Sequence, residues 1–331
     1  MSVEPILQIR DLSVSYNTAR GPLQALRNVA ISIHPGEIVG LVGESGCGKS
    51  TLMQSILGLL PNQAKVTSGA IGFAGQDLTT FSRRDMAKLL GDRISVVFQD
   101  PMSSLNPVLT IARQMIDIQF RSKSSKAQKR ARAIEMLARV RIPDPASKID
   151  RYPHEFSGGM RQRVAIAMAL MVEPDLLIAD EPTTALDATL EVATIDLLRE
   201  LQQEIGCAIL FITHHLGVVA ELCDRINVMY AGEVVETGPV AAMFRAPQHP
   251  YTRLLFACDP AQIVEPTRHL PTIGGRLPDL VDLPAGCIFA GRCPDRFDRC
   301  LTEVPGAWDA GASEHVRCHL AEPESAARAG A

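Results

Sequence analysis

Apolar positions along the chain follow two kinds of pattern. Residues 6–16 alternate apolar and polar side chains, as a half-exposed strand does. Continuous apolar runs, which suit buried parallel strands, occur at 38–42, 93–98, 175–179 and 207–213. Residues 49–60, 191–205 and 216–222 have the pattern of helices. Strands that alternate with helices predict a parallel, layered α/β core.

The segment between Gln99 and Ser157 has helical periodicity, with prolines only near its ends. We therefore expect a helical subdomain over about 100–160. Basic residues cluster at 121–132 within it. We favour the solvated start of a helix over a nucleic-acid patch, because no aromatic side chains are interleaved there to stack on bases.

The texture changes toward the C-terminus. Residues 226–236 predict a closing β-hairpin, and prolines break up the chain after it. We place a domain boundary near Arg245. This divides the chain into an α/β domain over 1–245, with a mixed sheet, and a small irregular extension over 246–331 that is too poorly cored to bury much surface.

Composition adds loose bounds. The 331 residues are 46% hydrophobic and 21% charged, and the net charge of -4 gives no overall attraction to nucleic acid or anionic lipid. The N-terminus lacks a secretory signal, and the apolar run at 164–172 is far shorter than the ~18 residues of a membrane span. We expect a cytosolic protein with reduced thiols that touches a membrane only through partners.

The sequence Gly43-x-x-x-x-Gly48-Lys49-Ser50 follows a predicted strand and opens a predicted helix, which is the context of a phosphate-binding loop. Lys49 is expected to reach the β- and γ-phosphates and Ser50 to bind Mg²⁺. We expect Cys47 to fill a small-residue position rather than to act as a reactive thiol. The loop residues expected to bind the nucleotide are Gly43, Glu44, Ser45, Gly46, Cys47, Gly48, Lys49, Ser50 and Thr51.

Two carboxylates follow the apolar run Leu176-Leu-Ile-Ala. Ligands bind at the carboxyl ends of such strands, so Asp180 is expected to hold Mg²⁺, and Glu181 to deprotonate the attacking water. Ser157-Gly158-Gly159 opens an apolar helix and forms a second anion site. One nucleotide needs only one phosphate cradle, so two of them indicate that a second subunit completes the chemistry.

Together these motifs resemble the ATP-binding cassette of membrane transporters over roughly 6–238. Phe156-Ser-Gly-Gly-Met160 resembles the signature loop of that family, with the usual Leu and Gln at its ends replaced. The resemblance implies that two cassettes pack head to tail, and that each ATP lies between the phosphate loop of one cassette and the signature of the other.

The resemblance also assigns roles to single residues. It places Gln99 where a glutamine senses Mg²⁺, and Asp187, in Ala185-Leu186-Asp187, in the loop that connects the two sites. It places Tyr16 against the adenine, although a core aromatic is nearly as good an interpretation. His214 matches the histidine that contacts the γ-phosphate, although His215 stands where an aspartate is usual. Transition-state charge would then fall to Lys49, Mg²⁺, His214 and the signature helix of the partner.

Further stretches resemble one branch of the family, the ATPase subunits of oligopeptide and dipeptide importers, which also includes nickel, glutathione and opine importers. They are 98–107, 152–157, 238–253 and 286–294. The resemblance implies a related but distinct partner ATPase, two permeases and an extracytoplasmic substrate-binding protein. It places the chain peripherally at the cytoplasmic face of the inner membrane.

Four cysteines stand in the extension without a Cys-x-x-Cys spacing, which disfavours a zinc ribbon. We favour a [4Fe–4S] cluster over zinc or unligated thiols, since such a cluster takes four cysteine ligands and some members of the branch carry one. His319 is the reserve ligand. The expected ligands are Cys287, Cys293, Cys300 and Cys318.

The leading hypothesis is an ATPase that powers peptide uptake. A soluble cassette protein of DNA repair or translation is the alternative from another class, but repair members carry long coiled-coil inserts and translation members usually two cassettes. A regulatory module without turnover is disfavoured by Glu181.

Overall fold

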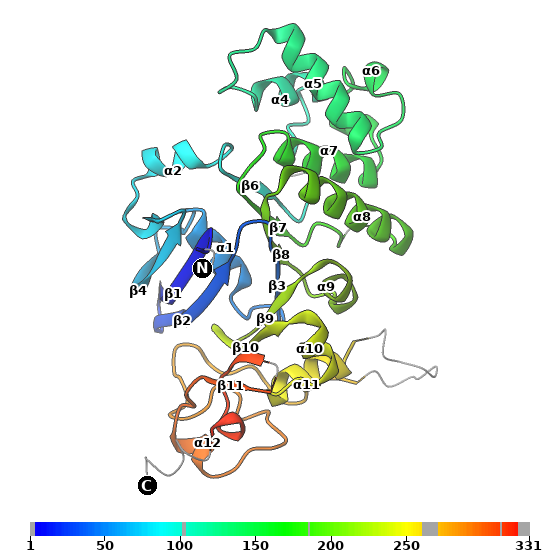
Figure 1. Cartoon of the computed structure of the whole chain (residues 1–331). Helices are drawn as coiled ribbons and strands as arrows, with labels where there is room; N and C mark the ends of the chain where they lie inside the picture. Colours follow the sequence, from blue (N-terminus) through cyan, green and yellow to red (C-terminus); the bar gives the residue numbers. More distant parts are fainter. Residues whose placement is uncertain (1–3, 101–103, 185, 260–270, 312, 324–331) are drawn as a thin grey trace. The chain divides into compact units, whose positions relative to one another are not determined.

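The computed structural model describes residues 4–100, 104–184, 186–259, 271–311 and 313–323 (Figure 1). These residues form two compact units, and each is described by itself. The first unit comprises the described residues within 1–6, 33–38 and 81–212. The second comprises those within 7–32, 39–80 and 213–331. The domain boundary expected near Arg245 and the extent of the helical subdomain stay predictions.

Three parallel strands form the core of the first unit. They are β6 (Ile94–Val97), β7 (Leu176–Asp180) and β8 (Ala208–Ile212). β7 lies between the other two and pairs with both in parallel. The five residues of β8 are all buried, as are the first four of β7, because helices cover both faces of such a sheet. The strand predictions therefore hold here to within a residue or two.

Helices make up most of the rest of the first unit. They are α2 (Arg83–Leu89), α4 (Ile111–Asp117), α5 (Lys126–Arg139), α6 (Pro145–Lys148), the short η2 (Pro153–Glu155), α7 (Gly158–Leu170) and α8 (Ala188–Ile205). Arginines of the basic cluster pair with carboxylates, for example Arg130 with Asp150 and Arg132 with Glu173, each at 2.6 Å. This supports the interpretation of that cluster as a solvated helix start.

The second unit contains an antiparallel sheet in the order β2-β1-β4-β5. Its strands are β1 (Leu7–Thr18), β2 (Gly21–Ile33), β4 (Ala64–Phe73) and β5 (Gln76–Asp77), and η1 (Leu78–Thr80) follows. The pattern at 6–16 predicts β1 correctly. β2 and β4 were not predicted, and the α/β layering alone does not account for this sheet.

A mixed sheet in the order β11-β12-β10-β9-β3 forms the rest of the core of the second unit. Its strands are β3 (Ile38–Val42), β9 (Arg225–Tyr230), β10 (Glu233–Pro239), β11 (Trp308–Ala310) and β12 (Ser313–Val316). β3 and β9 are parallel and the other pairs are antiparallel. The hairpin expected over 226–236 is confirmed, since Tyr230 and Glu233 are paired across its turn.

The helices of the second unit are short. They are α1 (Lys49–Ile56), α9 (Leu216–Leu222), α10 (Val240–Arg245), α11 (Pro250–Ala257), α12 (Arg299–Thr302) and η4 (His319–Ala321). α1 ends four residues before the end expected from the sequence. The helix therefore ends before Pro61-Asn62, and a turn at 57–58 follows it.

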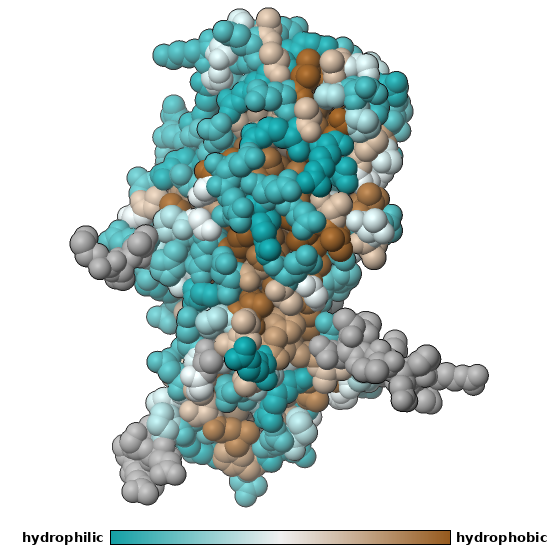
Figure 2. Space-filling model, turned by 45° about the vertical axis from the view of Figure 1, so that its right-hand side comes forward, coloured by the Kyte–Doolittle hydropathy of each residue, from teal (hydrophilic) through white to brown (hydrophobic). Residues whose placement is uncertain are grey.

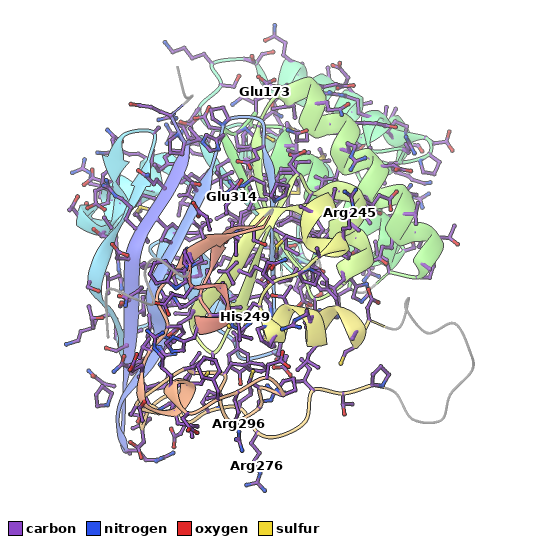
Figure 3. All side chains as sticks on the ribbon, turned by 60° about the horizontal axis from the view of Figure 1, so that its bottom comes forward. Glu173, Arg245, His249, Arg276, Arg296 and Glu314 are labelled. Carbon is purple, nitrogen blue, oxygen red and sulfur yellow. The ribbon has the colours of Figure 1, made fainter. Side chains whose placement is uncertain are left out.

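The C-terminal region is better cored than its proline content predicts. β12 adds to the mixed sheet through Val316, which pairs with Glu236 of β10 and is fully buried. Tyr230, Tyr251 and Phe289 form an aromatic cluster with ring centroids 4.6–5.4 Å apart. Glu314, which is labelled in Figure 3, lies on β12 and forms an ion pair with Arg225. The expectation of a poorly cored extension is therefore wrong for these residues.

The surface visible in Figure 2 is mostly hydrophilic, with hydrophobic residues in separate patches. Among the described residues, no helix combines the length and the apolarity that a membrane crossing requires. The exposed large hydrophobic side chains include Leu59, Phe98, Val108, Phe120, Tyr152, Leu301 and Val304.

Candidate functional site

The loop between β3 and α1 is shaped by glycines. A Cβ atom at Gly43 would lie 2.1 Å from the carbonyl oxygen of Met229, so any side chain there would clash with backbone. Gly48 caps α1 with φ 111°, where a Cβ atom would lie 2.9 Å from Leu26 and Met229 side-chain atoms. Only glycine fits both positions, and the loop can therefore close tightly around an anion.

Lys49 is the first residue of α1 and is 9% exposed. Its Nζ donates to the carbonyl oxygens of Gly43 at 2.7 Å and Glu44 at 3.1 Å. The ammonium group is therefore held inside the loop by the loop's own backbone. A compact cation in that position is suited to bind phosphate oxygens.

Other loop residues divide into buried and exposed groups. Ser45, Gly46 and Ser50 are exposed, so they are accessible to a ligand. Cys47 is 1% exposed, and burial raises the pKa of its thiol. This supports the expectation that Cys47 fills space rather than reacts. The hydroxyl groups of Thr51 and Tyr16 lie 3.3 Å apart, which places half-buried Tyr16 beside the loop.

In the first unit, the carboxylate of Glu181 is oriented by two neighbours. Gln99 Nε2 and Thr184 Oγ1 both donate to Glu181 Oε2, at 2.8 and 3.0 Å. Glu181 directly follows β7 and has φ 46°, a left-handed conformation that non-glycine residues rarely adopt. Seven other described non-glycine residues share a positive φ, so the hydrogen bonds to its carboxylate, and not this conformation, distinguish Glu181. Asp180 ends β7 and is half-buried.

The second anion site of the sequence lies at the start of α7. Ser157 is its N-cap and accepts a hydrogen bond from the Met160 backbone N–H at 3.4 Å. Ser157 and Gly158 are exposed, whereas Gly159 is buried against α8. A Cβ atom at Gly158 would meet nothing within 4 Å. An exposed helix N-terminus with open space before it can accept an anion.

Two further predicted residues lie at helix starts. Asp187 is the N-cap of α8 and accepts a hydrogen bond from the Leu190 backbone N–H at 3.0 Å. Ala185, named with it in the sequence, lies outside the described residues. His214 and His215 precede α9 in the second unit, are both exposed, and pack edge to face with ring centroids 4.7 Å apart. Their geometry does not favour one imidazole over the other.

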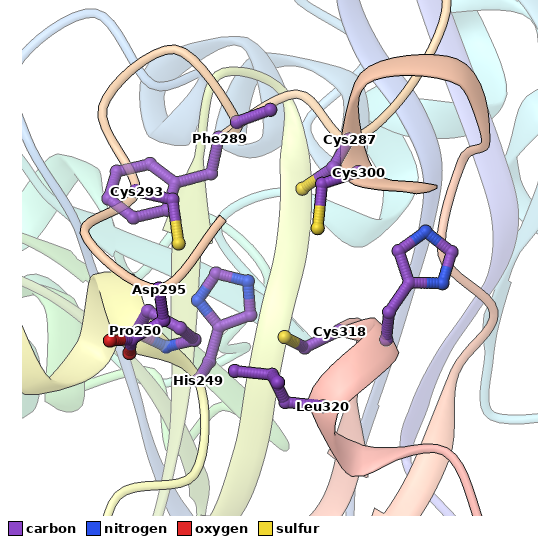
Figure 4. A pocket seen from close by; sticks show the side chains of 11 residues that line it. His249, Pro250, Cys287, Phe289, Cys293, Asp295, Cys300, Cys318 and Leu320 are labelled. Atoms are coloured by element: carbon purple, nitrogen blue, oxygen red, sulfur yellow. The ribbon is translucent and has the colours of Figure 1, made fainter. Parts of the chain in front are cut away.

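The four cysteines of the C-terminal region line one small cavity (Figure 4). Cys287, Cys300 and Cys318 are buried and Cys293 is half-buried. Burial and the neighbouring cysteines raise the pKa of the Cys287 thiol to about 11. The free volume is about 10 Å³, which is about the space of one water.

The donor set around this cavity bears on what it could hold. Four thiols suit an iron–sulfur cluster as well as zinc. Among the described residues, however, no three His, Cys, Asp or Glu side chains converge as the ligands of a metal ion do. A zinc–sulfur bond is about 2.3 Å long, so cysteine sulfurs that bind one zinc ion must lie close together. The four cysteine sulfurs of this cavity do not lie in such an arrangement. His319 lines the same cavity, with its Nε2 3.0 Å from the Glu303 carbonyl oxygen.

The structure thus brings together Tyr16 with the phosphate loop, Gln99 with Glu181, and the four cysteines around one cavity. Sequence reasoning missed two partners of Glu44. Arg292 binds its carboxylate, and the Tyr251 hydroxyl accepts a hydrogen bond from its backbone N–H. Both partners lie more than 200 residues downstream, and no local pattern indicates them.

Comparison with protein families gives two matches. Residues 26–184 match the ABC transporter family, and residues 235–300 match the oligopeptide/dipeptide transporter C-terminal region. The first match contains the phosphate loop, Gln99, the start of α7 and the Asp180-Glu181 pair. The second contains three of the four cysteines, Cys287, Cys293 and Cys300.

Curated relatives extend the likeness to nearly the whole chain. The dipeptide transport ATP-binding protein DppD of Bacillus subtilis (strain 168) is 46% identical over 320 residues, which cover 96% of this chain and 95% of that protein. The oligopeptide transport ATP-binding protein OppD of the same organism is 42% identical over 325 residues, with 98% and 91% covered.

Solved structures give the same architecture. The dimeric ATP-binding cassette MJ0796 bound to ADP and Pi is 30% identical with a TM-score of 0.63, and the match covers 71% of this chain and 98% of that one. CbiO1 of Clostridium perfringens, part of the ABC transporter complex cbiONQ, is 33% identical with a TM-score of 0.64. That match covers 73% of this chain and 91% of CbiO1.

Proposed function

The chain belongs to the ABC transporter family of ATP-binding proteins, and from that premise we propose that it powers the import of di- and oligopeptides. It is the ATPase subunit of such a transporter, with an α/β cassette fold. The observation that carries the peptide assignment is the match of residues 235–300 to the C-terminal region of oligopeptide/dipeptide transporters. The same machinery serving nickel, glutathione or opines is the alternative within the family.

We assign the phosphates of ATP to the loop Gly43–Thr51. Its backbone N–H groups and the N-terminus of α1 would bind the phosphate oxygens, with Lys49 reaching the β- and γ-phosphates. Ser50, Gln99 and Asp180 offer oxygen ligands of the kind that Mg²⁺ prefers. Tyr16, beside Thr51, would stack on the adenine. Mg²⁺ would neutralise the charge that develops on the phosphates during hydrolysis.

We assign Glu181 as the general base of hydrolysis. Its carboxylate is held by Gln99 and Thr184, so one oxygen is fixed and the group has a defined orientation. A base oriented in this way removes a proton from the attacking water as the water approaches the γ-phosphorus. His214 is assigned to the γ-phosphate, where a donor stabilises the transferring group.

The start of α7 supports an ATP site shared between two chains. Ser157 and Gly158 are exposed at the N-terminus of a 13-residue helix, where an anion is favoured. We propose that this end binds the γ-phosphate held by the partner, with Asp187 in the connection between the two sites. The partners would be a related but distinct ATPase, two permeases and an extracytoplasmic binding protein.

For the C-terminal region we propose a [4Fe–4S] cluster held by Cys287, Cys293, Cys300 and Cys318. The support is that all four thiols line one cavity and that such a cluster takes four cysteine ligands, whereas the described residues contain no group of three side chains placed to hold a metal ion. A cluster is larger than the free space of about 10 Å³, so the four side chains would have to move in order to hold it. Its role would be to pin the region together rather than to transfer electrons.

The cluster is tested by anaerobic purification with iron and acid-labile sulfide analysis. We expect about four of each per chain in the wild type and a large loss in Cys287→Ser. Cys258→Ser is the matched control, since Cys258 is a half-buried cysteine of the same region that does not line the cavity. Bound zinc with no iron would contradict the proposal.

The transport function is tested in the assembled complex. We expect the chain to co-purify with two polytopic permeases, and Glu181→Gln to bind ATP with turnover reduced at least about a hundredfold. Glu173→Gln is the control, because Glu173 is an exposed glutamate that forms an ion pair with Arg132 and is not assigned to the ATP site. Unchanged hydrolysis by Glu181→Gln would overturn the assignment of the base. A chain found only in a soluble complex would favour a non-transport ATPase.

A further inference from the structure

One residue of the phosphate loop is bound by a side chain 248 positions downstream. Arg292 Nη1 donates to Glu44 Oε2 at 2.7 Å, and Arg292 Nη2 donates to Glu44 Oε1 at 3.0 Å. This is a bidentate pair, the strongest geometry that arginine and a carboxylate form. The Arg292 side chain is 5% exposed and that of Glu44 is 28% exposed. Solvent therefore screens this pair less than it screens a surface ion pair.

All five N–H groups of the Arg292 guanidinium have acceptors. Besides Glu44, Nη1 donates to the Tyr230 hydroxyl at 3.4 Å, Nη2 to the Ile273 carbonyl at 2.9 Å, and Nε to the Gly274 carbonyl at 2.9 Å. The guanidinium carbon also lies 5.7 Å from the centroid of the Tyr230 ring. These contacts fix the position of the Arg292 guanidinium, and the guanidinium in turn fixes the carboxylate of Glu44.

The backbone of Glu44 is fixed from the same region. The Tyr251 hydroxyl accepts a hydrogen bond from the Glu44 N–H at 3.0 Å, and Tyr251 itself is fully buried. The Glu44 carbonyl accepts in turn from Lys49 Nζ. The N–H group, the carbonyl group and the side chain of Glu44 therefore all have hydrogen-bond partners.

The charge of Glu44 is unfavourable for its own loop. A carboxylate in a loop that binds phosphates raises the energy of the bound anion, and at short range this effect is strong where solvent is partly excluded. Arg292 cancels that charge and holds the carboxylate in one orientation. Without Arg292, Glu44 would be free to turn and its negative charge would be uncompensated.

We propose that Arg292 is a positioning residue for ATP binding, which holds and neutralises Glu44 so that the loop Gly43–Thr51 accepts the phosphates. The inference rests on the proposed function of that loop. It makes the C-terminal region part of the nucleotide site, through an arginine next to one of the cavity cysteines, Cys293. Arg292 acts through Glu44 and need not touch the nucleotide.

The test measures MgATP affinity of the full-length chain and its ATP KM in the assembled complex. We expect Arg292→Met to raise the Kd about tenfold, which corresponds to about 1.4 kcal/mol. Arg292→Lys keeps the charge but loses the bidentate fork, so its Kd should lie between those of the wild type and Arg292→Met. Arg296→Met is the matched control, because Arg296 is an exposed arginine of the same segment (Figure 3).

The decisive variant is the double substitution Arg292→Met with Glu44→Gln. If the damage comes from the uncompensated charge of Glu44, the double variant regains most of the affinity that Arg292→Met loses. If Arg292 only supports the carbonyls of Ile273 and Gly274, the double variant is no better than the single one, and the inference is overturned. Circular dichroism and thermal unfolding establish that each variant is folded.

A separate variant distinguishes this inference from the function on which it rests. Lys49→Ala should abolish MgATP binding if Gly43–Thr51 is the phosphate loop. Undiminished binding by Lys49→Ala would overturn the proposed loop itself. Normal affinity of folded Arg292→Met, in a chain whose Lys49→Ala variant does not bind, would overturn only the role of Arg292.

Discussion

Gly43 shows how a single position shapes the phosphate loop. Its φ of 154° and the Met229 carbonyl, 2.1 Å from where a Cβ atom would stand, together leave room for no side chain. The strand before it and the helix after it are joined at this point. Backbone freedom here is therefore a requirement of the fold as well as of the site.

We predict that Gly43→Ala destabilises the protein by at least about 2 kcal/mol and removes ATP binding, because backbone must shift to admit the methyl group. Gly75→Ala is the control. Gly75 has φ 79° but nothing lies within 4 Å of an added Cβ atom, so only the strain of about 1 kcal/mol remains. Urea denaturation of both variants measures the difference. Equal losses would show that the Met229 contact does not matter.

His315 on β12 gives the second prediction at this scale. Burial and the charge of Arg317 lower the pKa of its imidazole below the ordinary value of 6.5. The unfolded chain therefore binds a proton at this residue at a higher pH than the folded chain does. Stability from neutral His315 is fully present above about pH 6.5 and is lost as the pH falls below it.

His315→Gln should flatten this dependence, since glutamine does not titrate. We expect the free energy of unfolding to fall less between pH 7.5 and pH 5.5 in the variant than in the wild type. Urea titrations at the two pH values measure it. Identical losses in both proteins would show that His315 does not contribute to the acid sensitivity.

At the scale of elements, two neighbouring glycines in the first turn of α7 have different surroundings. A Cβ atom at Gly159 would lie 3.1 Å from Leu190 Cδ1 of α8, whereas Gly158 faces open space. Gly158 is therefore a candidate for ligand approach, and Gly159 for helix packing.

We predict that Gly159→Ala costs about 1 kcal/mol of stability because Leu190 must move, while Gly158→Ala is neutral or slightly stabilising. Gly158→Ala should nevertheless reduce hydrolysis in the assembled complex at least about tenfold, since its methyl group would occupy the space proposed for the partner's phosphate. Thermal unfolding and turnover are measured on both. Full activity of Gly158→Ala would contradict the shared site.

How far the sequence predicts these elements depends on the regularity of their burial. β3, β7 and β8 are buried along nearly their whole length, and their apolar runs predict them well. β4 buries only Ile71 and Phe73, near its end, and three consecutive exposed residues at 67–69 interrupt its alternation. In β2 the residue Asn28 has φ 46°, and this irregularity breaks the alternating pattern.

For the site, what can be predicted depends on whether the contacting residues are neighbours in the sequence. Motifs formed by neighbouring residues, such as Gly43–Thr51 and Ser157–Gly159, are visible in the sequence because one turn of chain contains the whole arrangement. Contacts between distant segments are not. Gln99 is predicted as a Mg²⁺ sensor, but its hydrogen bond to Glu181, 82 positions away, depends on β6 and β7 being neighbours in the sheet.

At the scale of the whole molecule, the cassette is expected to be incomplete alone. The chain carries one phosphate loop and one signature, which the proposed arrangement assigns to two different ATP sites.

We predict that the isolated chain binds MgATP but hydrolyses it at least about tenfold more slowly than the complex with the partner ATPase and permeases, because the signature helix of the partner is missing. Turnover measured across protein concentrations, with mass determined by light scattering, tests this. Rapid turnover by a proven monomer would contradict the shared site, and full activity with a second copy of this chain would contradict a distinct partner.

The bond between Arg292 and Glu44 also has a consequence for how such proteins can be recombined. A hybrid that joins this cassette to the C-terminal segment of another importer would keep Glu44 in its phosphate loop but would lose Arg292, the residue that neutralises it. Such hybrids should function only when both positions come from one parent or are a matched pair. Among relatives, substitutions at 44 and 292 should therefore occur together, so that the two ends of the gene evolve as one unit.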